Sequence, residues 1–447
     1  MRALIAAAVS VLALLGAPGH AADLPVARME KVIAEQAQNN LFMGAVLIAK
    51  GDTVILDKAY GTANLELKVP NTTQTKFRIG SVTKQFTAAA ILLLEEQGKL
   101  KTSDLLKSHL LGIPAAWDQV TIFHLLTHTS GIFNYTSLPE MGEFKRRKLS
   151  PSQVADLVKD KPLEFSPGER HKYSNTGYVV LGEVIEKVSG QSYAQFLQTQ
   201  IFNPLGLKNT GYEDQSVVMP GRAAGYERRD GKLINSSFID MSVPFSAGAL
   251  YSTTHDLLAW DNALFAGKLI SPSSLQKMTT PFKDDYGFGL IINSVDGHKR
   301  IQHFGGIDGF SSALSRYPDD QLTIIVLNNV GNGATGVLAS HLESVAFGKP
   351  VTLTSERKEV AVDAKLLARY VGRYEIAPNV VLDVTQDGNS LFTQMGKQPR
   401  LQLYAESTTK FFTRAIDAQV SFADGEGPAP SLTLHQGDRA IPAKRVP

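Results

Sequence analysis

The chain has 447 residues, with 45 Lys and Arg, 43 Asp and Glu, and no cysteine. This length exceeds one ordinary domain, and the near-neutral charge gives no basic surplus for holding a nucleic acid. The lack of cysteine excludes a disulfide framework, Cys-ligated zinc, a thiol nucleophile and an acylated-cysteine lipid anchor.

Residues 1–21 have the pattern of a secretory signal peptide. A short basic start at Arg2 precedes an apolar run, and small residues at Gly19 and Ala21 occupy the positions that a signal peptidase reads. The run is too short for an ordinary membrane span, although an uncleaved anchor helix is the alternative. We expect cleavage near Ala21, a periplasmic or secreted bacterial protein, and no membrane anchor afterwards.

The next part of the chain begins and ends with strand patterns. Residues 44–50 and 53–57 are β-rich runs joined by a turn at 51–52. Apolar residues then recur at helical spacing from Ser81 to about Leu100. Further helices are predicted at 151–160, 176–190, 192–201, 254–266 and 335–346, and strands at 299–304, 310–317 and 322–328. An α+β fold follows, in which an antiparallel sheet joins the two ends around a helical insertion.

The remaining residues have a different composition. A polar segment at 349–362 is typical of a linker. After it, short alternating strands are predicted at 380–384, 390–393, 401–403, 410–413, 420–422 and 432–435. Such spacing favours a small antiparallel β-barrel or sandwich. The predicted organisation is a signal peptide at 1–21, a main domain at 22–348, the linker, and a barrel domain at 363–447.

A Ser-x-x-Lys motif can supply a nucleophile, because residues i and i+3 share a helix face and the amine can take the hydroxyl proton. The motif occurs three times, as Ser81/Lys84, Ser274/Lys277 and Ser355/Lys358. Only the first opens an Ala- and Leu-rich helix, where burial would lower the pKa of the lysine. The alternative is that Ser81 serves only as a helix N-cap.

Two further motifs carry polar groups suited to catalysis. Tyr173 and Asn175 precede a predicted helix; a phenol can relay a proton, and an amide can hold a lysine or a substrate carbonyl. His303, Gly305 and Gly306 follow in a late strand, where glycines let the backbone approach a ligand. The alternatives are a surface turn with a capping Asn, and a β-bulge beside a core histidine.

Other motifs are interpreted as local structure. The glycine-rich run at 331–336 matches the dinucleotide-binding pattern, but the acidic residue about twenty positions on, Glu356, lies in the polar linker and not at the end of a strand. His124 and His128 have zinc-ligand spacing but lack the glutamate of H-E-x-x-H. The chain has no G-x-S-x-G, so the nucleophile elbow of the α/β-hydrolases is absent.

The three polar motifs occur in the order and rough spacing of a known family. The chain resembles the serine β-lactamase and penicillin-binding-protein superfamily, in its class C-like branch with D-aminopeptidase and esterase-like members. The resemblance covers about 30–348, with supporting stretches at 124–131, 165–168, 201–206 and 247–252. The tail at 367–374, with Phe411 and Phe412, is similar to the lipocalin-like barrel that follows many such domains.

The resemblance implies a fold and a set of roles. The fold would be a β-lactamase/transpeptidase-like antiparallel sheet flanked by helices. Ser81 would form an acyl-enzyme, with proton transfer shared by Lys84 and Tyr173. Substrate binding and positioning would fall to Asn175, His303 and Gly305, and the backbone N–H groups of Ser81 and Gly306 would form the oxyanion hole. No metal and no organic cofactor is implied.

The third motif departs from the lactamase pattern. Penicillin-hydrolysing members usually carry Lys-Thr-Gly where this chain has His303, Phe304 and Gly305. A histidine is largely neutral at pH 7, so a substrate carboxylate would bind less well unless Arg78 or another cation substitutes.

We therefore expect a secreted serine hydrolase acting on D-amino-acid-containing peptides or amides, or on small esters. We expect a small peptide, amide or ester substrate, a class that includes peptidoglycan-derived peptides, and no nucleic-acid partner. One alternative is a penicillin-binding D,D-carboxypeptidase or endopeptidase, or a class C-like β-lactamase. Another is a catalytically idle muropeptide-binding module. The sequence leaves the oligomeric state open.

Overall fold

The computed structural model describes residues 24–229, 231–331, 334–396, 398–414, 416, 418–436 and 439–447. The predicted signal peptide at 1–21 lies outside these described residues. Within them, no helix combines the length and the apolar character needed to cross a membrane.

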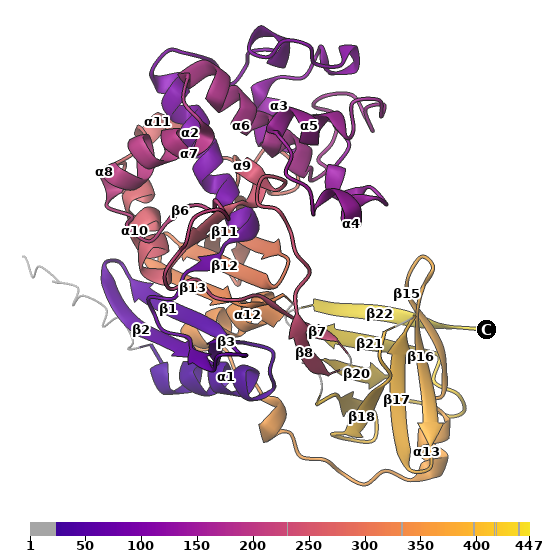
Figure 1. Ribbon diagram of the computed structural model, residues 1–447. Coiled ribbons are helices and arrows are strands. Elements are labelled where there is room, and N and C mark those ends of the chain that lie inside the picture. Colours follow the sequence, from indigo (N-terminus) through magenta and orange to yellow (C-terminus); the bar gives the residue numbers. More distant parts are fainter. Residues whose placement is uncertain are drawn as a thin grey trace, which may run out of the picture.

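A six-stranded antiparallel sheet lies at the centre of the main domain (Figure 1). Strand β1 (Gly44–Lys50) pairs on one side with β2 (Thr53–Tyr60) and on the other with β13 (Leu322–Asn328). The sheet continues outward from β13 through β12 (Phe310–Tyr317), β11 (His298–Ile307) and β10 (Ile291–Val295). The two ends of the domain therefore meet in one sheet, as the strand patterns predicted.

Helices cover both faces of this sheet. Alternate residues of β1 point to opposite faces. Val46 and Ile48 pack with helices α1 (Val26–Gln38) and α12 (Ala334–Ala346), whereas Ala45 and Leu47 belong to the larger core on the other face. Burial on both faces explains why this strand is a continuous apolar run instead of an alternating one.

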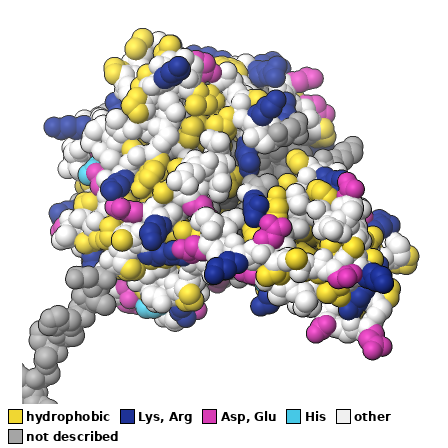
Figure 2. Space-filling view, turned by 90° about the horizontal axis from the view of Figure 1, so that it is seen from below, with side chains coloured by type: hydrophobic (Ala, Val, Ile, Leu, Met, Phe, Trp, Pro, Cys, Tyr) yellow, Lys and Arg dark blue, Asp and Glu magenta, His cyan; other side chains and the backbone are white. Residues whose placement is uncertain are grey.

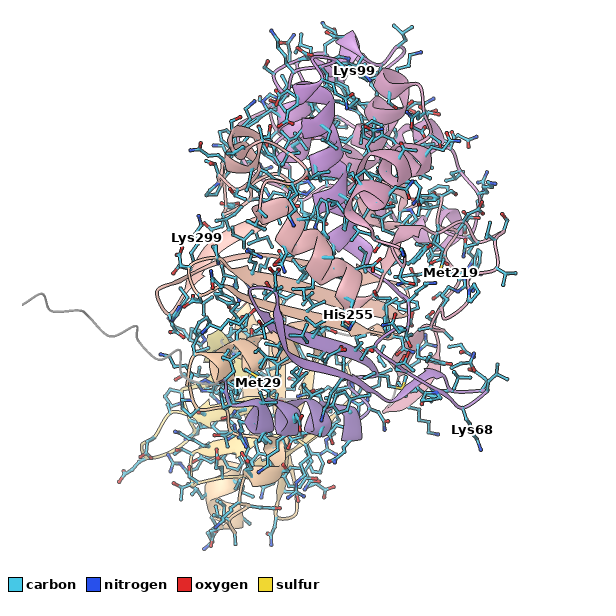
Figure 3. The ribbon with its side chains drawn as sticks, turned by 90° about the vertical axis from the view of Figure 1, so that its left-hand side faces the viewer. Met29, Lys68, Lys99, Met219, His255 and Lys299 are labelled. Atoms are coloured by element: carbon cyan, nitrogen blue, oxygen red, sulfur yellow. The ribbon has the colours of Figure 1, made fainter. Side chains whose placement is uncertain are left out.

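The larger core lies between the sheet and the helical insertion. Its central helix α2 (Thr83–Glu96) is buried along most of its length and packs against α6 (Asn175–Ser189). Figure 3 shows Lys99, which follows α2, at the far end of the helical part from Met29 of α1. The remaining helices are α3 (Ile122–Leu126), α4 (Met141–Phe144), α5 (Pro151–Asp156), α7 (Tyr193–Leu197), α8 (Asn203–Leu205), α9 (Phe245–Gly248), α10 (Thr254–Phe265) and α11 (Pro272–Met278).

Several short strands join the insertion to the sheet, and the sequence pattern missed them. A three-stranded sheet places β9 (Leu250–Ser252) between β5 (Phe77–Arg78) and β6 (Gly211–Tyr212). The others are β3 (Thr62–Asn64), β4 (Val69–Pro70), β7 (Tyr226–Arg229), β8 (Lys232–Asn235) and β14 (Val330–Gly331). Strands of two to four residues carry too few alternations to stand out from loops.

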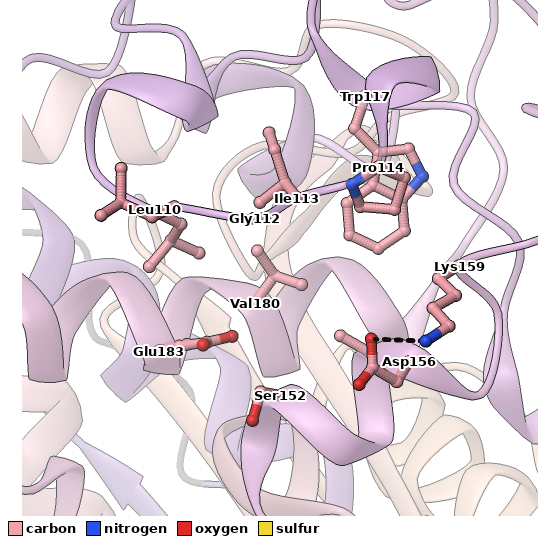
Figure 4. Close-up of a pocket in the computed structure, with 12 residues that line it drawn as sticks. Leu110, Gly112, Ile113, Pro114, Trp117, Ser152, Asp156, Lys159, Val180 and Glu183 are labelled. Atoms are coloured by element: carbon pink, nitrogen blue, oxygen red, sulfur yellow. Dashed lines mark ion pairs between the residues drawn. The ribbon is translucent and has the colours of Figure 1, made fainter.

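A shallow pocket opens on the helical part (Figure 4). Trp117, Val180 and Glu183 line it, and Asp156 pairs with Lys159 at 3.9 Å on its rim. None of the predicted catalytic residues lines this pocket.

The C-terminal strands form a closed antiparallel barrel, which completes the predicted fold class. Its strands are β15 (Gly372–Ala377), β16 (Val380–Asp387), β17 (Ser390–Met395), β18 (Leu401–Ala405), β19 (Lys410–Phe412), β20 (Gln419–Phe422), β21 (Ser431–Gln436) and β22 (Arg439–Val446). The first and last strands pair and close it. A short helix, α13 (Ala364–Ala368), precedes the barrel, and Tyr370 stacks on Phe422 inside it at 4.2 Å between ring centroids.

The segment between the two parts is attached to helix α1. The backbone N–H groups of Thr354 and Ser355 donate to the Glu35 carboxylate, and Arg28 pairs with Glu356. On the face shown in Figure 2, basic and acidic side chains are interspersed. This distribution agrees with the near-neutral charge of the sequence.

Candidate active site

Ser81 lies in a tight turn, Gly80–Val82, that leads directly into helix α2. Gly80 has a φ of +49°, and a Cβ there would lie 2.8 Å from the backbone nitrogen of Gly306. The turn therefore needs glycine both for its conformation and for the close approach of strand β11. The side chain of Ser81 stays partly exposed, so a substrate can reach it.

Lys84 lies one helical turn further on, and its amine contacts three oxygen atoms. Nζ is 2.9 Å from Ser81 Oγ, 2.8 Å from Asn175 Oδ1 and 2.8 Å from the backbone oxygen of Ala247. The side chain is fully buried, and this burial holds the pKa of Lys84 well below its ordinary value.

The lowered pKa of Lys84 favours the neutral amine, which has two N–H groups and one lone pair. Asn175 Oδ1 and the Ala247 carbonyl can only accept, so they take both N–H groups. The lone pair then faces Ser81 Oγ. Such an amine is ready to accept the serine proton.

Tyr173 contacts the same serine from the other side. Its hydroxyl donates to Ser81 Oγ at 2.8 Å, and its ring centroid lies 4.8 Å from Lys84 Nζ. Burial raises the pKa of the Tyr173 phenol, which therefore stays protonated at neutral pH.

Asn175 is held by contacts that the sequence did not reveal. Its Oδ1 accepts from Lys84, and its Nδ2 donates to Thr136 Oγ1 at 3.3 Å, so the orientation of the amide is fixed. Its backbone N–H donates to Asn134 Oδ1 at 3.1 Å. Neither Asn134 nor Thr136 belongs to a recognisable motif, so only their place beside Asn175 identifies them.

Strand β11 carries the third motif past the serine. A Cβ at Gly305 would lie 2.0 Å from the backbone oxygen of Ile79, so only glycine fits there. A Cβ at Gly306 would meet no atom within 4 Å. The close approach predicted for these glycines is therefore made by Gly305, and to the protein's own backbone.

Gly306 is placed to complete an oxyanion hole with Ser81. Ile307 faces Phe310 across a two-residue turn, and alternate residues of β11 bond to β12. The N–H of Gly306 thus points to the opposite edge of the strand, beside Gly80. Pairing with β10 ends at Gln302, so among the described residues no strand covers this edge next to Ser81.

His303 is buried, and both of its ring nitrogens have partners inside the protein. Nδ1 is 2.6 Å from the backbone oxygen of Phe304, and Nε2 is 3.0 Å from the hydroxyl of Tyr286. Burial, followed by the nearby Lys84, lowers the pKa of His303 to about 3. The imidazole is therefore uncharged at neutral pH.

Arg78, named above as a cation that might serve in place of the lysine, is already paired. Its Nε and Nη2 each donate to the buried Glu213 carboxylate at 2.8 Å. Arg222 contacts the same carboxylate at 2.9 Å.

The motifs rejected on the sequence have structural partners of their own. Lys277 pairs with Glu95 at 2.9 Å, and the Ser355 hydroxyl bonds to Glu35. His124 forms a capping box at the start of α3 through its Nδ1. Among the described residues, no group of His, Asp and Glu is arranged to hold a metal ion. Part of the glycine-rich run at 331–336 lies outside the described residues.

The fold and the serine–lysine–tyrosine site define the class of protein, and comparison with known families agrees. The β-lactamase family model matches residues 29–343, which is well over half of the chain. The chain therefore belongs to the β-lactamase family, whose structural neighbours include hydrolases. A second model, of a domain of unknown function (DUF3471), matches residues 356–444 and so covers the barrel.

Individual relatives agree with this assignment. Penicillin-binding protein 4* of Bacillus subtilis is 32% identical over 430 residues, covering 89% of this chain and 94% of that protein. The octameric penicillin-binding protein homologue of Pyrococcus abyssi superimposes with a TM-score of 0.68 at 25% identity, over 94% of this chain and 100% of that one. A D-stereospecific amidohydrolase of Streptomyces superimposes with a TM-score of 0.62 at 26% identity, over 72% of this chain and 99% of that one.

Proposed function

We propose that this protein is an exported serine hydrolase that cleaves D-amino-acid amides or peptides, or small esters, through an acyl-enzyme. The observation that carries the proposal is the contact of Ser81 Oγ with both Lys84 Nζ at 2.9 Å and Tyr173 Oη at 2.8 Å. The nucleophile thus has a proton acceptor on one side and a proton donor on the other.

In the first step, Ser81 passes its proton to the neutral amine of Lys84 while its oxygen attacks the substrate carbonyl carbon. The opposite pKa shifts of Lys84 and Tyr173 favour the amine as the base, because a phenol with a raised pKa is a donor. The developing oxyanion would accept from the N–H groups of Ser81 and Gly306, each worth about 10²–10³ in rate.

The leaving group then departs with a proton that returns from Lys84, either directly or through the Tyr173 hydroxyl. This leaves an ester between the acyl group and Ser81 Oγ. Water attacks the ester with the same groups acting in reverse, and the acid product is released while Ser81 regains its proton. Asn175 keeps the Lys84 amine aligned throughout, because its own amide is held on the other side by Thr136.

The substrate class follows from the charges near the third motif. His303 is buried and uncharged, Phe304 has no hydrogen-bonding side chain, and Arg78 is bound to Glu213. A substrate carboxylate would therefore lose hydration without meeting either the lysine of the lactamase pattern or an unpaired Arg78. A neutral amide or ester does not pay this penalty. The likeness to a D-stereospecific amidohydrolase supports the same choice.

The test is a substrate panel applied to Ser81→Ala and to a matched control. The control is Ser274→Ala, because Ser274 is the serine of a second Ser-x-x-Lys motif whose lysine pairs with Glu95. We expect Ser81→Ala to abolish turnover of D-alanine p-nitroanilide and p-nitrophenyl butyrate, and the control to retain it. Activity that survives in Ser81→Ala, or a wild type inactive on every substrate of the panel, would refute the proposal.

A second candidate is a penicillin-binding D,D-peptidase or a β-lactamase. The name of the Bacillus subtilis relative favours it, since that protein is called a penicillin-binding protein and matches nearly the whole chain. Nitrocefin turnover, or stable labelling of Ser81 by a fluorescent penicillin, would support this candidate over the first. The idle binding module is disfavoured because Ser81, Lys84 and Tyr173 keep their mutual contacts.

Export is part of the proposal and rests on the sequence of residues 1–21 alone. N-terminal sequencing of the protein recovered from the periplasm or the medium tests it. A mature chain that starts just after Ala21 is the expected result, and an uncleaved chain in the membrane fraction would contradict it.

A further inference from the structure

A buried row of three rings, those of His128, Tyr286 and His303, connects the segment that follows helix α3 to the third motif. His128 Nε2 is 3.2 Å from the hydroxyl of Tyr286, and that hydroxyl is 3.0 Å from His303 Nε2. His128 lies 158 residues before Tyr286, and Tyr286 lies 17 residues before His303. The three side chains are nearly inaccessible to solvent, at 1%, 2% and 3% exposure. On the sequence, His128 was interpreted as local structure and Tyr286 was not singled out.

The bonds at the two ends of the row fix the direction of every hydrogen bond within it. The backbone N–H of Ser174 can only donate, so His128 Nδ1 accepts it at 3.2 Å and the proton of the neutral ring is on Nε2. The backbone oxygen of Phe304 can only accept, so His303 carries its proton on Nδ1. Tyr286 must then accept from His128 and donate to His303.

His128 also holds the segment that carries Tyr173. Its backbone oxygen accepts from the N–H of Lys172 at 2.9 Å, and its ring accepts from the N–H of Ser174. The residue between them, Tyr173, packs its ring against His128 at 4.2 Å between centroids, with the two planes tilted by 44°. His128 has a φ of +55°, a conformation uncommon for residues other than glycine. Such backbone strain persists where the surroundings over-determine the position.

The groups around this row disfavour a positive charge on His303. Lys84 from α2 and Tyr173 face His303, while Tyr173, Tyr178 from α6 and His171 surround His128. The carboxylate of Asp284 contacts His171 at 3.4 Å, and the ring centroid of His171 lies 5.4 Å from that of Tyr286. A proton on His303 would therefore be buried, with a donor, Tyr286, aimed at the nitrogen that has to take it.

We propose that His128 and Tyr286 are positioning residues that hold Tyr173 in place and keep His303 as an uncharged imidazole in one tautomer, so that the cleft selects substrates without a carboxylate on the leaving group. The preference for substrates without a carboxylate rests on the proposed function, and the proposal here adds the physical origin of that preference. His303 cannot act as the cation that a lysine supplies at this position in penicillin-hydrolysing members. Both of its nitrogens are bound to the protein, so it acts on the substrate only through the shape and polarity of strand β11.

The main test removes the Tyr286 hydroxyl with Tyr286→Phe, which keeps the ring. A donor bound to the neutral imidazole opposes protonation, so its loss raises the pKa of His303. We expect nitrogen NMR of histidine-labelled wild type to show His303 with its proton on Nδ1 and no titration from about pH 5 to 9, and Tyr286→Phe to bring its titration into this range. His303→Gln assigns the signal. Titration of His303 near its ordinary pKa in the wild type would overturn the proposal.

The second measurement is of substrate selectivity. It compares hydrolysis of a D-alanyl dipeptide that has a free carboxylate with hydrolysis of the same dipeptide as its amide. In Tyr286→Phe, the ratio of kcat/KM for the acid to that for the amide should rise about tenfold at about pH 5 and return to the wild-type ratio at about pH 8. The matched control is Tyr374→Phe in the barrel, a buried tyrosine whose hydroxyl donates to the Tyr370 carbonyl at 3.0 Å. An unchanged ratio in Tyr286→Phe, or an equal rise in the control, would refute the selectivity.

A variant of His128 tests the hydrogen bond to Tyr286 from the other end of the row, and it can be used if Tyr286→Phe does not fold. Asn tolerates a positive φ, and in His128→Asn the new Oδ1 can take the Ser174 N–H in place of Nδ1, but no donor reaches Tyr286. We expect the His303 signal to shift in this variant as it does in Tyr286→Phe. A His303 signal that does not shift in this variant would contradict the claim that the row sets the protonation state of His303. If the wild type hydrolyses nothing, the proposed function fails, and the NMR spectra still decide the protonation state.

Discussion

Replacing Lys84 with Met should make the stability of the protein less dependent on pH. In the folded chain, burial holds the pKa of the Lys84 amine well below 10.5, the ordinary value at which the amine titrates in the unfolded chain. Between these two pKa values the unfolded state binds one more proton, so the wild type becomes more stable as pH rises. Above pH 10.5 the amine is neutral in both the folded and the unfolded state, so the stability no longer changes with its protonation.

The magnitude follows from this proton difference. One proton changes the free energy of unfolding by about 1.4 kcal/mol per pH unit, or about 2.7 kcal/mol between pH 7 and pH 9. Lys84→Met lacks this titrating amine, so the difference in unfolding free energy between the wild type and the variant should rise by about 1.4 kcal/mol per pH unit. The variant also leaves Asn175 Oδ1 and the Ala247 carbonyl without the amine, at a cost of about 1–3 kcal/mol each. That cost shifts the difference by a constant and leaves the slope intact.

The assay is urea unfolding followed by tryptophan fluorescence at pH 7, 8 and 9. Both tryptophans, Trp117 and Trp260, lie in the main domain, so the signal does not include the barrel. Lys277→Met is the control, because Lys277 is half-exposed and paired with Glu95, and we expect no comparable slope for it. A flat difference between wild type and Lys84→Met would show that the folded protein keeps Lys84 protonated. The reasoning that makes it the base would then be wrong.

Three further changes have expected outcomes. Tyr173→Phe should lower kcat on D-alanine p-nitroanilide about 10²–10⁴-fold with an unchanged circular dichroism spectrum, and a loss under about threefold would remove Tyr173 from proton transfer. Gly305→Ala should lower the melting temperature by an amount equivalent to about 1–3 kcal/mol, whereas Gly306→Ala, which faces open space, should not; equal values would contradict the geometry. Glu213→Gln should destabilise the fold by about 3–5 kcal/mol in urea unfolding, because Arg78 loses its buried partner, and a neutral result would show that the pair contributes little.

Much of the architecture was predictable because it depends on local patterns. The continuous apolar run of β1 and the helical spacing after Ser81 gave the central sheet and its main helix. The predicted helices at 151–160 and 192–201 are too long, since α5 ends at Asp156 and α7 ends at Leu197, where a π-helical turn, Gln198–Phe202, follows. The strands β15 and β22, which close the barrel, were also missed. Their pairing joins residues some seventy positions apart, and no local pattern encodes it.

The sequence by itself determined which side chains this site has to work with. Ser81 and Lys84 one helical turn apart, the phenol of Tyr173 and the amide of Asn175 are fixed by residue type and spacing. The absence of cysteine excludes a thiol nucleophile, and the replacement of Lys-Thr by His303 and Phe304 can be read directly from the chain.

Only the tertiary structure decided the protonation states of those groups. Burial of Lys84 among Ser81, Asn175 and the Ala247 carbonyl makes it an acceptor, and no local spacing predicts that carbonyl. The structure also engages Arg78 with Glu213 and surrounds His303 with Tyr286 and His128. A pKa depends on the solvation and neighbours of a group in space, and the folded chain brings these neighbours from distant segments.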